Sequence, residues 1–591
     1  MVPFAVRITH NEDLIGSCLS GVEDLNRRLA LNAGYALVTA ALLFIGTAGA
    51  GFAAPAAVPV SPDPSVYGKN GCLALDKQGS SKNYLHSEVE PWVTVDPNNS
   101  SHLVGAWQQD RWSDGGAHGL VASYSTQGGA SGSWNVSPQP FSVCWHASGY
   151  TNADNWLNYQ RASDPWVSIG PGAPGNQGGN TVYSVSLSFD QTPFGADVNA
   201  VDNAVGAAVS YDNGAFWSHV QTIIADPCVQ GAFGSPGYVC NSAKAYVFND
   251  KESVTADPNR PGVAYAVWDR LVAPPANPST GFQHERAYFG QTFISTTTDF
   301  GAHWSQARPL FGLASQDQTI GNQIVINRQD DTLYDFFNLI QNASNTGGNR
   351  GYNVAYSKST DGGSTWTAPV VVNHLESAGI KDPANYNPYT NAPPAPSRTG
   401  DIIPEPGINP NNGQLYVVWQ DSRFNSFSND EVVISTSSDG GVNWSAPERV
   451  NAHTAEPAYN PAIFVDLVGT VGVTYDQWQS NALGNEATDL FIRKSTSAGS
   501  SSAGPTFADP VVVDGPFNNL AAPVSRGYFL GDYQGLTVGS GGWTAFDVKT
   551  NCSDGNSSTQ PSCRAIQSVL PPTSRTPTDN NSTDVYAYPG S

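Results

Sequence analysis

The sequence predicts an all-β fold: a single β-propeller of four-stranded antiparallel blades, with seven blades favoured and six as the alternative. Two repeats and the composition indicate this fold. The 591 residues include 59 Gly, 42 Pro, 24 Tyr and 15 Trp, which is typical of many short strands joined by turns. Helical periodicity is nearly absent. A propeller can hold this length as one domain because it grows by adding blades.

The first repeat has the pattern S/T-x-D-x-G-x-x-W and occurs four times. Its clearest copy, Ser359 to Trp366, follows a strand-like run that begins at Val354. The aspartate can accept hydrogen bonds from backbone N–H groups of a tight turn, the glycine takes a positive φ, and the tryptophan packs between neighbouring sheets. We therefore expect equivalent turns at four aspartates, Asp212, Asp299, Asp361 and Asp439.

The second repeat lies upstream of the first. It is a short apolar strand that ends in a Pro, Asn or Gly turn, as in VEPWVTVDPNN from Val89 and SDPWVSIGPG from Ser163, and a strand rich in Val, Tyr and Trp often follows. Seven such units can be counted, and two of them carry degenerate copies of the turn motif. The seventh unit lacks the motif but can supply four strands, near Leu536, Trp543, Ile566 and Val585.

The turn motif resembles the Asp boxes, also called BNR repeats, of sialidases and other β-propellers. As architecture, the resemblance covers nearly the whole mature chain. It implies that the boxes are structural and lie on the face opposite an active site. A sialidase uses a tyrosine nucleophile there, and its arginines bind the substrate carboxylate. The chain departs from sialidases at its first strand, where VEPWV places Glu90 before Pro91 and the Arg-Ile-Pro motif is absent.

The alternation of strand direction predicts which residues share the other face. Acid and arginine pairs recur in the loops after second strands, and an acid recurs at the start of first strands, so we expect these groups to converge. The resemblance implies Asp110 or Asp114 as the acid and Tyr533, beside Asp532, as the nucleophile. The residues expected to hold the substrate are Arg111, Arg270, Arg423, Glu90, Asp164, Glu252, Asp269, Glu405 and Asp421. Alternatively, the acid and arginine pairs are salt bridges that stabilise each loop.

Five acids at the starts of first strands should lie close together: Glu90, Asp164, Glu252, Glu405 and Asp532. Because like charges repel, either the loop arginines alternate with them or a cation lies among them. No cofactor is expected, with Ca²⁺ as the exception kept open, since carboxylate and carbonyl oxygens suit it. The histidines and cysteines show no zinc spacing, so no metal ligands are assigned.

Two functions fit these observations. The first is a secreted glycoside hydrolase, exo-α-sialidase-like, that acts on acidic or surface glycans; the second is a non-catalytic propeller that binds glycans or proteins at the cell surface. The net charge of −23, from 50 acidic and 27 basic residues, argues against nucleic acid and anionic membranes as partners. A monomer that binds a glycan or glycoconjugate is expected.

The N-terminal region predicts export. Arg27 and Arg28 precede an apolar run that ends in small residues, so residues 1–50 are interpreted as a secretory signal, with an uncleaved membrane anchor as the alternative. Residues 51–66 are rich in Ala and Pro and are interpreted as a linker, followed by the propeller over 67–591. The expected location is extracellular or periplasmic.

Six cysteines follow the predicted signal, an even number that favours disulfides in an exported chain. Close spacing favours Cys228 with Cys240 and Cys552 with Cys563, which leaves Cys72 with Cys144. Other connectivities stay open at this stage.

Overall fold

A computed structural model describes residues 57–68, 72, 82–173, 179–190, 202–226, 246–273, 289–314, 317–341, 351–381, 396–454, 456–478, 487–550 and 582–591. They belong to one compact part of the chain, residues 54–591, and are nearly all β, which confirms the all-β part of the predicted fold class. Their helices are short: α2 (Val143–Ala147) and the 3₁₀ turns η2 (Arg423–Asn425) and η3 (Asn519–Ala521). None of the described helices is long and apolar enough to cross a membrane. The predicted signal, 1–50, lies outside the described residues.

The strands follow one another as antiparallel units, which we number in chain order. Unit 1 consists of β2 (Asn83–Asp96), β3 (Asn99–Trp112), β4 (Ala117–Ser125) and β5 (Asn135–Pro138). Unit 2 consists of β6 (Arg161–Pro171), β7 (Asn180–Asp190), β8 (Asp202–Ser210) and β9 (Ser218–Asp226). Unit 3 consists of β10 (Tyr246–Ala256), β11 (Ala264–Ala273), β12 (Phe289–Thr297) and β13 (Arg308–Pro309). Unit 4 consists of β14 (Gln318–Ile326), β15 (Leu333–Ile340), β16 (Tyr352–Ser359) and β17 (Val370–His374).

The later units follow the same plan, with one exchange at the end of the chain. Unit 5 consists of β20 (Glu405–Ile408), β21 (Leu415–Asp421), β22 (Glu431–Ser437) and β23 (Glu448–Arg449). Unit 6 consists of β24 (Ala458–Val465), β25 (Val471–Trp478) and β26 (Ala487–Ser497), which pairs with both β27 (Thr506–Phe507) and β28 (Val511–Asn518). Unit 7 consists of β30 (Gly535–Gly539), β31 (Gly542–Thr550), β32 (Thr583–Pro589) and β1 (Val58–Pro59).

The outer strand of unit 7 therefore comes from the N-terminal side of the chain. β1 falls within residues 51–66, the predicted linker, so part of that segment belongs to a sheet. The strand predicted near Ile566 lies outside the described residues.

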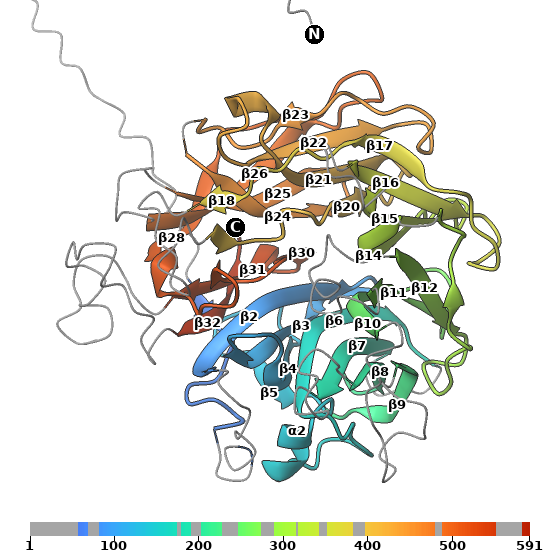
Figure 1. Ribbon diagram of the computed structural model, residues 1–591, viewed down its shortest axis with the longest axis vertical. Helices are drawn as coiled ribbons and strands as arrows, with labels where there is room; N and C mark the ends of the chain where they lie inside the picture. Colours follow the sequence, from blue (N-terminus) through green and yellow to red (C-terminus); the bar gives the residue numbers. More distant parts are fainter. Residues whose placement is uncertain are drawn as a thin grey trace, which may run out of the picture. The chain divides into compact units, whose positions relative to one another are not determined.

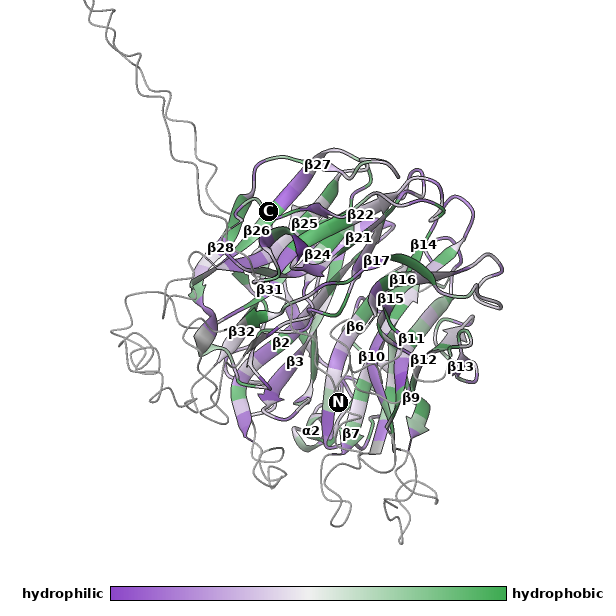
Figure 2. Ribbon diagram, turned by 45° about the horizontal axis from the view of Figure 1, so that its top comes forward, coloured by the Kyte–Doolittle hydropathy of each residue, from purple (hydrophilic) through white to green (hydrophobic). Residues whose placement is uncertain are grey.

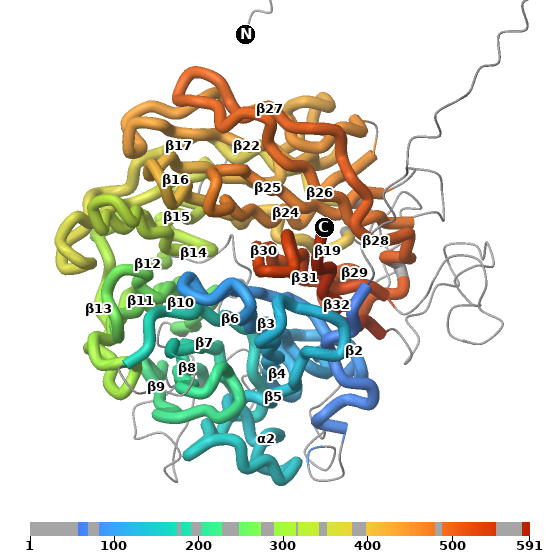
Figure 3. Tube along the Cα trace, turned by 180° about the vertical axis from the view of Figure 1, so that it is seen from behind, coloured from blue at the N-terminus to red at the C-terminus, as the bar shows by residue number. Residues whose placement is uncertain are grey.

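The first strands of the units are neighbours in space. β2 contacts β6, and the contacts continue through β10, β14, β20, β24 and β30, which contacts β2. Figure 1 shows these strands around a common centre, and Figure 3 shows the same arrangement from behind. Two connections meet there: β18 (Ile380–Lys381) and β19 (Pro396–Arg398) lie between units 4 and 5, and β29 (Tyr528–Phe529) lies between units 6 and 7. The parallel pairing of β19 with β29 places Arg398 beside Phe529.

The core lies between the units. Each main hydrophobic cluster combines residues from two adjacent units; Val418 and Tyr475 share one between units 5 and 6, and Trp107 and Phe546 share one between units 7 and 1. Green, hydrophobic stretches along the strands in Figure 2 mark these buried faces. Burial of apolar surface between sheets thus holds the units together.

The four motif aspartates form equivalent turns, as predicted. In each turn the Ser or Thr hydroxyl donates to the aspartate, at 2.8–3.0 Å, and accepts the glycine N–H, at 2.8–2.9 Å. The aspartate also accepts a backbone N–H from four residues further on, at 2.9–3.0 Å. The glycine φ lies between 82° and 102° in all four, a conformation that favours glycine.

The motif tryptophans pack as expected. Trp217, Trp304, Trp366 and Trp444 each pack on the cluster shared with the preceding unit. The Trp444 ring, for example, lies 5.9 Å from Phe336 and 6.0 Å from Tyr356 of unit 4, between ring centroids. The motifs follow third strands, which run in the same direction as first strands, so they lie at the opposite edge from the starts of the first strands.

The buried hydroxyl of the turn motif should contribute more to the free energy of unfolding than an exposed hydroxyl of the same turn. Ser359→Ala is expected to lower the free energy of unfolding by about 1 kcal/mol, because the Gly363 N–H loses its acceptor. Ser364→Ala, which removes an exposed hydroxyl from the same turn, is the control. Urea unfolding measures both, and equal effects would contradict the role of the buried hydroxyl.

Candidate functional site

The first strands of five units contain the same bulge. Just before the apolar run, two residues of the first strand lie opposite one residue of the second strand, and the first of the two has a positive φ. A non-glycine residue in this conformation costs about 1 to 2 kcal/mol, so its surroundings must hold it there. These first residues are Glu90 (φ 55°), Asp164 (49°), Lys251 (51°), Gly321 (76°) and Asn460 (46°).

The register corrects one sequence-based assignment. The repeat predicts that Glu252 is equivalent to Glu90 and Asp164, whereas Lys251 holds that position and Glu252 is the second residue of the bulge. Glu252 is buried, and neither of its carboxylate oxygens accepts a hydrogen bond from another described residue. Burial, together with the charge of Asp164, raises the pKa of Glu252 well above its usual range. A positive charge therefore stands where a third negative charge was expected.

Lys251 joins three of the predicted acids. Its Nζ lies 2.7 Å from Asp164 Oδ1, 2.8 Å from Asp532 Oδ2 and 3.4 Å from Glu90 Oε1, and its side chain is only 5% exposed. Burial opposes the charge of Lys251, but the three carboxylates outweigh it and raise the pKa of Lys251 well above its usual range. Burial, opposed by Lys251, raises the pKa of Glu90 to about 7. We call Lys251, Glu90, Asp164 and Asp532 the central cluster.

Two arginines adjoin the central cluster. Arg398, on β19, donates to both carboxylate oxygens of Asp532, with Nε at 3.1 Å and Nη2 at 2.6 Å. Arg111 donates to Ser525 Oγ at 3.2 Å and to Gln108, which in turn donates to Glu90. Both guanidinium groups lie over the Phe529 ring, at 4.2 Å for Arg398 and 4.8 Å for Arg111. Both positive charges therefore interact with the same aromatic ring.

The charges of these arginines respond to each other and to the acids. Burial opposes the charge of Arg398, but Asp532 outweighs it and raises the pKa of Arg398. Burial, reinforced by Arg398, lowers the pKa of Arg111 to about 10, although Glu90 acts against it. Arg526 is exposed and interacts electrostatically with both Arg398 and Asp532. Arg526 therefore adds an exposed positive charge beside the buried ion pairs of the central cluster.

Tyr533 lies in an aromatic wall beside the central cluster. Trp92 and Trp166 stack at 3.6 Å, and the Tyr533 ring lies 5.2 Å from that of Trp166. The Tyr533 hydroxyl donates to the Pro165 carbonyl oxygen at 3.3 Å. Burial and the charge of Glu90 raise the pKa of Tyr533 well above its usual range. As described, the hydroxyl is a protonated donor, and its predicted role as a nucleophile stays a prediction.

Several other predicted site residues form hydrogen bonds or ion pairs with a neighbouring unit and not with the central cluster. Asp269 accepts hydrogen bonds from Thr319 Oγ1 and the Gly321 N–H, both at 2.8 Å, in the bulge of unit 4. Arg270 donates to Asp226 Oδ2 at 2.9 Å, on the outer strand of unit 2. Asp269 and Arg270 therefore contact two different units and do not form the salt bridge with each other that the alternative predicts.

The remaining predicted residues also have local partners. Asp110 is buried and accepts from Ser65 Oγ at 2.7 Å and from the His86 N–H at 2.9 Å. The other contacts join Asp114 to Arg161 (2.8 Å), Arg423 to Asp421 (2.7 Å) and Gln323 to Glu405 (3.0 Å). Of the predicted residues, Glu90, Asp164, Asp532, Tyr533 and Arg111 are thus brought together.

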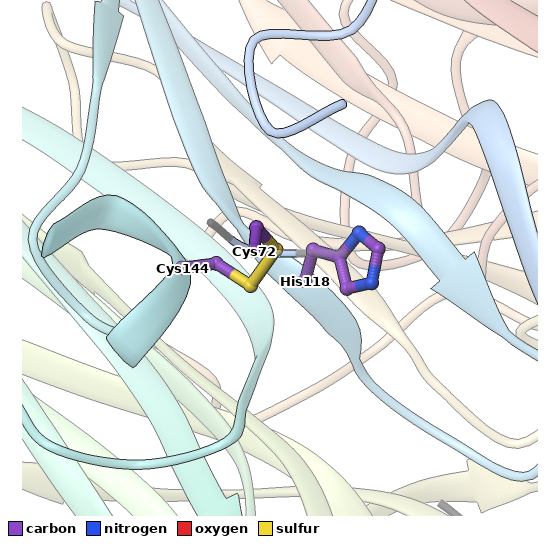
Figure 4. A group of neighbouring side chains, drawn as sticks. All are labelled: Cys72, His118 and Cys144. Carbon is purple, nitrogen blue, oxygen red and sulfur yellow. A yellow bond between two sulfur atoms is a disulfide. The ribbon is translucent and has the colours of Figure 1, made fainter. Parts of the chain in front are cut away.

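The Cys72–Cys144 disulfide is present, and the other four cysteines after the predicted signal lie outside the described residues. His118 lies beside this disulfide (Figure 4), and these three residues form the one group of three metal-binding residue types found among the described residues. Both sulfurs are committed to the disulfide, and His118 Nδ1 lies 3.1 Å from Asp110 Oδ2. This group is therefore part of the structural support of unit 1.

Sequence reasoning missed Lys251 and Arg398. Lys251 could have been found by aligning Val93, Val167 and Val254, each the second residue after its bulge, because Lys251 then takes the repeat position of Glu90 and Asp164. Arg398 lies in a connection outside the repeats, and only the pairing of β19 with β29 brings it to the centre.

Comparisons with known proteins find similarity in solved structures. No protein-family model and no curated protein matches the chain. An α-L-arabinofuranosidase of Fusarium graminearum with arabinobiose matches at a TM-score of 0.41 and 12% identity, over 71% of this chain and 92% of that one. A Trypanosoma rangeli sialidase in complex with sialic acid matches at 0.37 and 12%, over 74% and 56%. A mutant NanB sialidase from Streptococcus pneumoniae matches at 0.34 and 11%, over 78% and 65%.

These neighbours are named as an α-L-arabinofuranosidase and two sialidases. Similarity at these TM-scores and identities does not establish an activity or a substrate. Function must therefore be argued from the site itself.

Proposed function

We propose that the protein is a secreted glycoside hydrolase that cleaves acidic glycans, in the manner of an exo-α-sialidase, at the central cluster. The observation that carries the proposal is the buried position of Glu90 in the central cluster, where burial raises its pKa to about 7, a value that suits proton transfer near neutral pH. Lys251 forms an ion pair with Glu90, and Arg111 is linked to Glu90 through Gln108. In this proposal Glu90 protonates the leaving oxygen, and Tyr533 or a water molecule attacks the sugar and gives up its proton to Asp164 or Asp532.

The arginines supply the binding side of the proposal. Arg398 is 15% exposed and Arg526 is exposed, so these two guanidinium groups reach the surface next to the buried acids. Guanidinium groups bind carboxylates through two parallel hydrogen bonds, which favours a sugar that carries a carboxylate. A substrate carboxylate would compete with Asp532 for Arg398, since Asp532 holds that guanidinium through both of its oxygens.

The proposal also includes the number of blades and the closure of the propeller. Seven units arranged as blades of a closed propeller are supported by the contacts of β30 with β2 and by the shared core of units 7 and 1. The β1 strand, paired with β32, would close the ring by joining the two ends of the chain. Export is supported by the disulfide, because such bonds persist in oxidising compartments.

Hydrolysis of fluorogenic glycosides tests the activity, with sialic acid, uronic acid and arabinofuranose derivatives as the panel. Glu90→Gln is expected to lower kcat/KM about 100-fold or more, because the proton donor is lost. Asp430→Asn, which neutralises a buried carboxyl group of unit 5 outside the site, is the matched control. Activity of the unmodified protein should fall as the pH rises through about 7, since Glu90 must be protonated. Cleavage that is equal in Glu90→Gln and Asp430→Asn would contradict the assignment.

A non-catalytic propeller that binds glycans or proteins is the second candidate. Two observations favour it: Lys251 already contacts three carboxylates, and the Tyr533 hydroxyl is bonded to Pro165. In that case no glycoside of the panel is cleaved. Binding to acidic glycans on an array would then be retained in Glu90→Gln and lost in Arg398→Met, because only the arginine would contact the ligand.

A further inference from the structure

The interface between units 6 and 7 contains two buried carboxyl groups, Asp476 on β25 and Asp547 on β31, which are 0% and 3% exposed. Both oxygens of Asp476 and Oδ2 of Asp547 accept no hydrogen bond from any described residue. Burial and the charge of Asp547 raise the pKa of Asp476 well above its usual range, and burial raises the pKa of Asp547 to about 8. Apart from the backbone N–H of Val548, which acts on Asp547, the pair thus lacks the hydrogen-bond partners that buried carboxylates normally require.

Strand alternation shows that the two groups face each other across the interface. On β25, Gly472, Thr474 and Asp476 share one face, and a Cβ atom at Gly472 would meet the Trp543 ring of unit 7. The opposite face of β25, with Val473 and Tyr475, packs on unit 5.

Two uncharged side-chain oxygens near these carboxyl groups also have no hydrogen-bond partner among the described residues. Gln534 is 2% exposed; its Nε2 donates to the Asn460 carbonyl oxygen of unit 6, and its Oε1 has no described donor. The register pairs Gly535 with Phe546, so Gln534 lies opposite Asp547, and Asn460 follows Tyr459, the register partner of Asp476. Thr474 Oγ1, on the Asp476 face, also lacks a described partner and is 1% exposed. The carboxyl groups, an amide oxygen and a hydroxyl therefore converge from two units.

The lysine that acts on Asp547 is already paired with another carboxylate. Lys549 acts on Asp547 electrostatically, but its Nζ lies 2.7 Å from Asp514 Oδ2. Among the described residues, no lysine or arginine pairs with Asp476 or Asp547 within salt-bridge distance. Two ionised carboxylates here would repel each other, so either a cation or a proton must accompany them.

We propose that a Ca²⁺ ion binds between units 6 and 7, held by the carboxylates of Asp476 and Asp547, the Gln534 carbonyl oxygen and the Thr474 hydroxyl. Ca²⁺ takes six to eight oxygen ligands of these types, and water completes the shell where protein does not. The ion would bridge the last two units, next to the position where β1 pairs with β32. It offsets the two negative charges, and it stabilises the folded state because the unfolded chain does not assemble the ligands.

Thermal unfolding at about pH 8, where protons compete least, tests the proposal. Protein freed of metal with a chelator is expected to gain several degrees in Tm when about 1 mM Ca²⁺ is added, a concentration suited to extracellular sites. Elemental analysis after gel filtration in Ca²⁺ should give one calcium per chain. Asp476→Asn should lose both responses. Asp335→Asn, which changes a buried carboxyl group of unit 4 that also lacks described partners, should keep both.

The alternative is that the two carboxyl groups share a proton, and it predicts different changes in Tm. Ca²⁺ would then leave Tm unchanged, and Asp476→Asn would raise Tm at pH 8 because it removes a group that is costly to ionise. Either result would overturn the proposal, as would a calcium response that survives in the double variant Asp476→Asn, Asp547→Asn.

Discussion

Lowering the pH from about 8 to about 4 is expected to stabilise the protein. Several carboxyl groups are buried without a cation beside them, and burial raises the pKa of Asp269 and of Glu405 to about 8 and the pKa of Asp190 and of Asp430 to about 6. In the unfolded chain these groups ionise near pH 4. Their contribution to stability is therefore complete below about pH 4 and is lost as the pH rises toward 8.

The Asp boxes set the lower limit of this window. Hydrogen bonds from Thr365 lower the pKa of Asp361 to about 2, and those from Asn443 lower the pKa of Asp439 to about 2. A lowered pKa acts in the opposite sense, since its contribution is present above about pH 4 and is lost as the pH falls toward 2. The two sets of carboxyl groups together predict a maximum of stability near pH 4.

Differential scanning calorimetry from pH 2 to pH 9, in a chelator, measures the profile. One unit of pKa shift corresponds to about 1.4 kcal/mol, so Asp269 or Glu405 alone should change the free energy of unfolding by at least ~2 kcal/mol across the window. Glu405→Gln, which mimics the protonated acid, should reduce the loss of stability between pH 5 and pH 8. Asp330→Asn, at an exposed carboxyl group, is the control. A protein that is most stable at pH 7 to 8 would contradict this account.

Local features of the fold were predictable because they depend on neighbouring residues. The Asp-box turns require a hydroxyl, a carboxylate and a glycine within five residues, and the structure shows the same hydrogen bonds in all four copies. The Cys72–Cys144 disulfide followed from the spacing of the other cysteines. The joining of β1 to unit 7 was not predicted, because a two-residue strand has no periodicity to recognise.

The site was only partly predictable, because a bulge changes which residue points out of a strand. Glu90 and Asp164 precede proline, and their bulges were readable as equivalent positions, whereas in unit 3 the shift of one residue selects Lys251 over Glu252. Arg270 and Arg423 did not converge, since each pairs with an aspartate near the edge of its sheet. Arg398 reaches the centre by a pairing between connections more than one hundred residues apart in the chain, which no local pattern encodes.

Lys251→Met is expected to destabilise the protein by about 3 to 5 kcal/mol, the cost of removing one partner from a buried ion cluster. Without the ammonium group, Glu90, Asp164 and Asp532 are three buried carboxyl groups that have lost a shared counter-charge, while Arg398 still pairs with Asp532. Repulsion among them must then be relieved by protonation or by opening of the bulges, which already hold Glu90 and Asp164 at positive φ.

Three measurements separate this electrostatic cause from loss of packing. Lys549→Met removes a more exposed ion pair, with side chains 23% and 20% exposed, and should cost less than about 1 kcal/mol in urea unfolding. The double variant Lys251→Met, Asp164→Asn should recover part of the loss, because one uncompensated carboxylate is removed with the lysine. The deficit of Lys251→Met should also shrink between pH 7 and pH 5, as the acids take up protons that replace the ammonium charge. A deficit that is independent of pH and unchanged in the double variant would show that the lysine acts through its packing, and the central cluster would then not be a set of coupled charges.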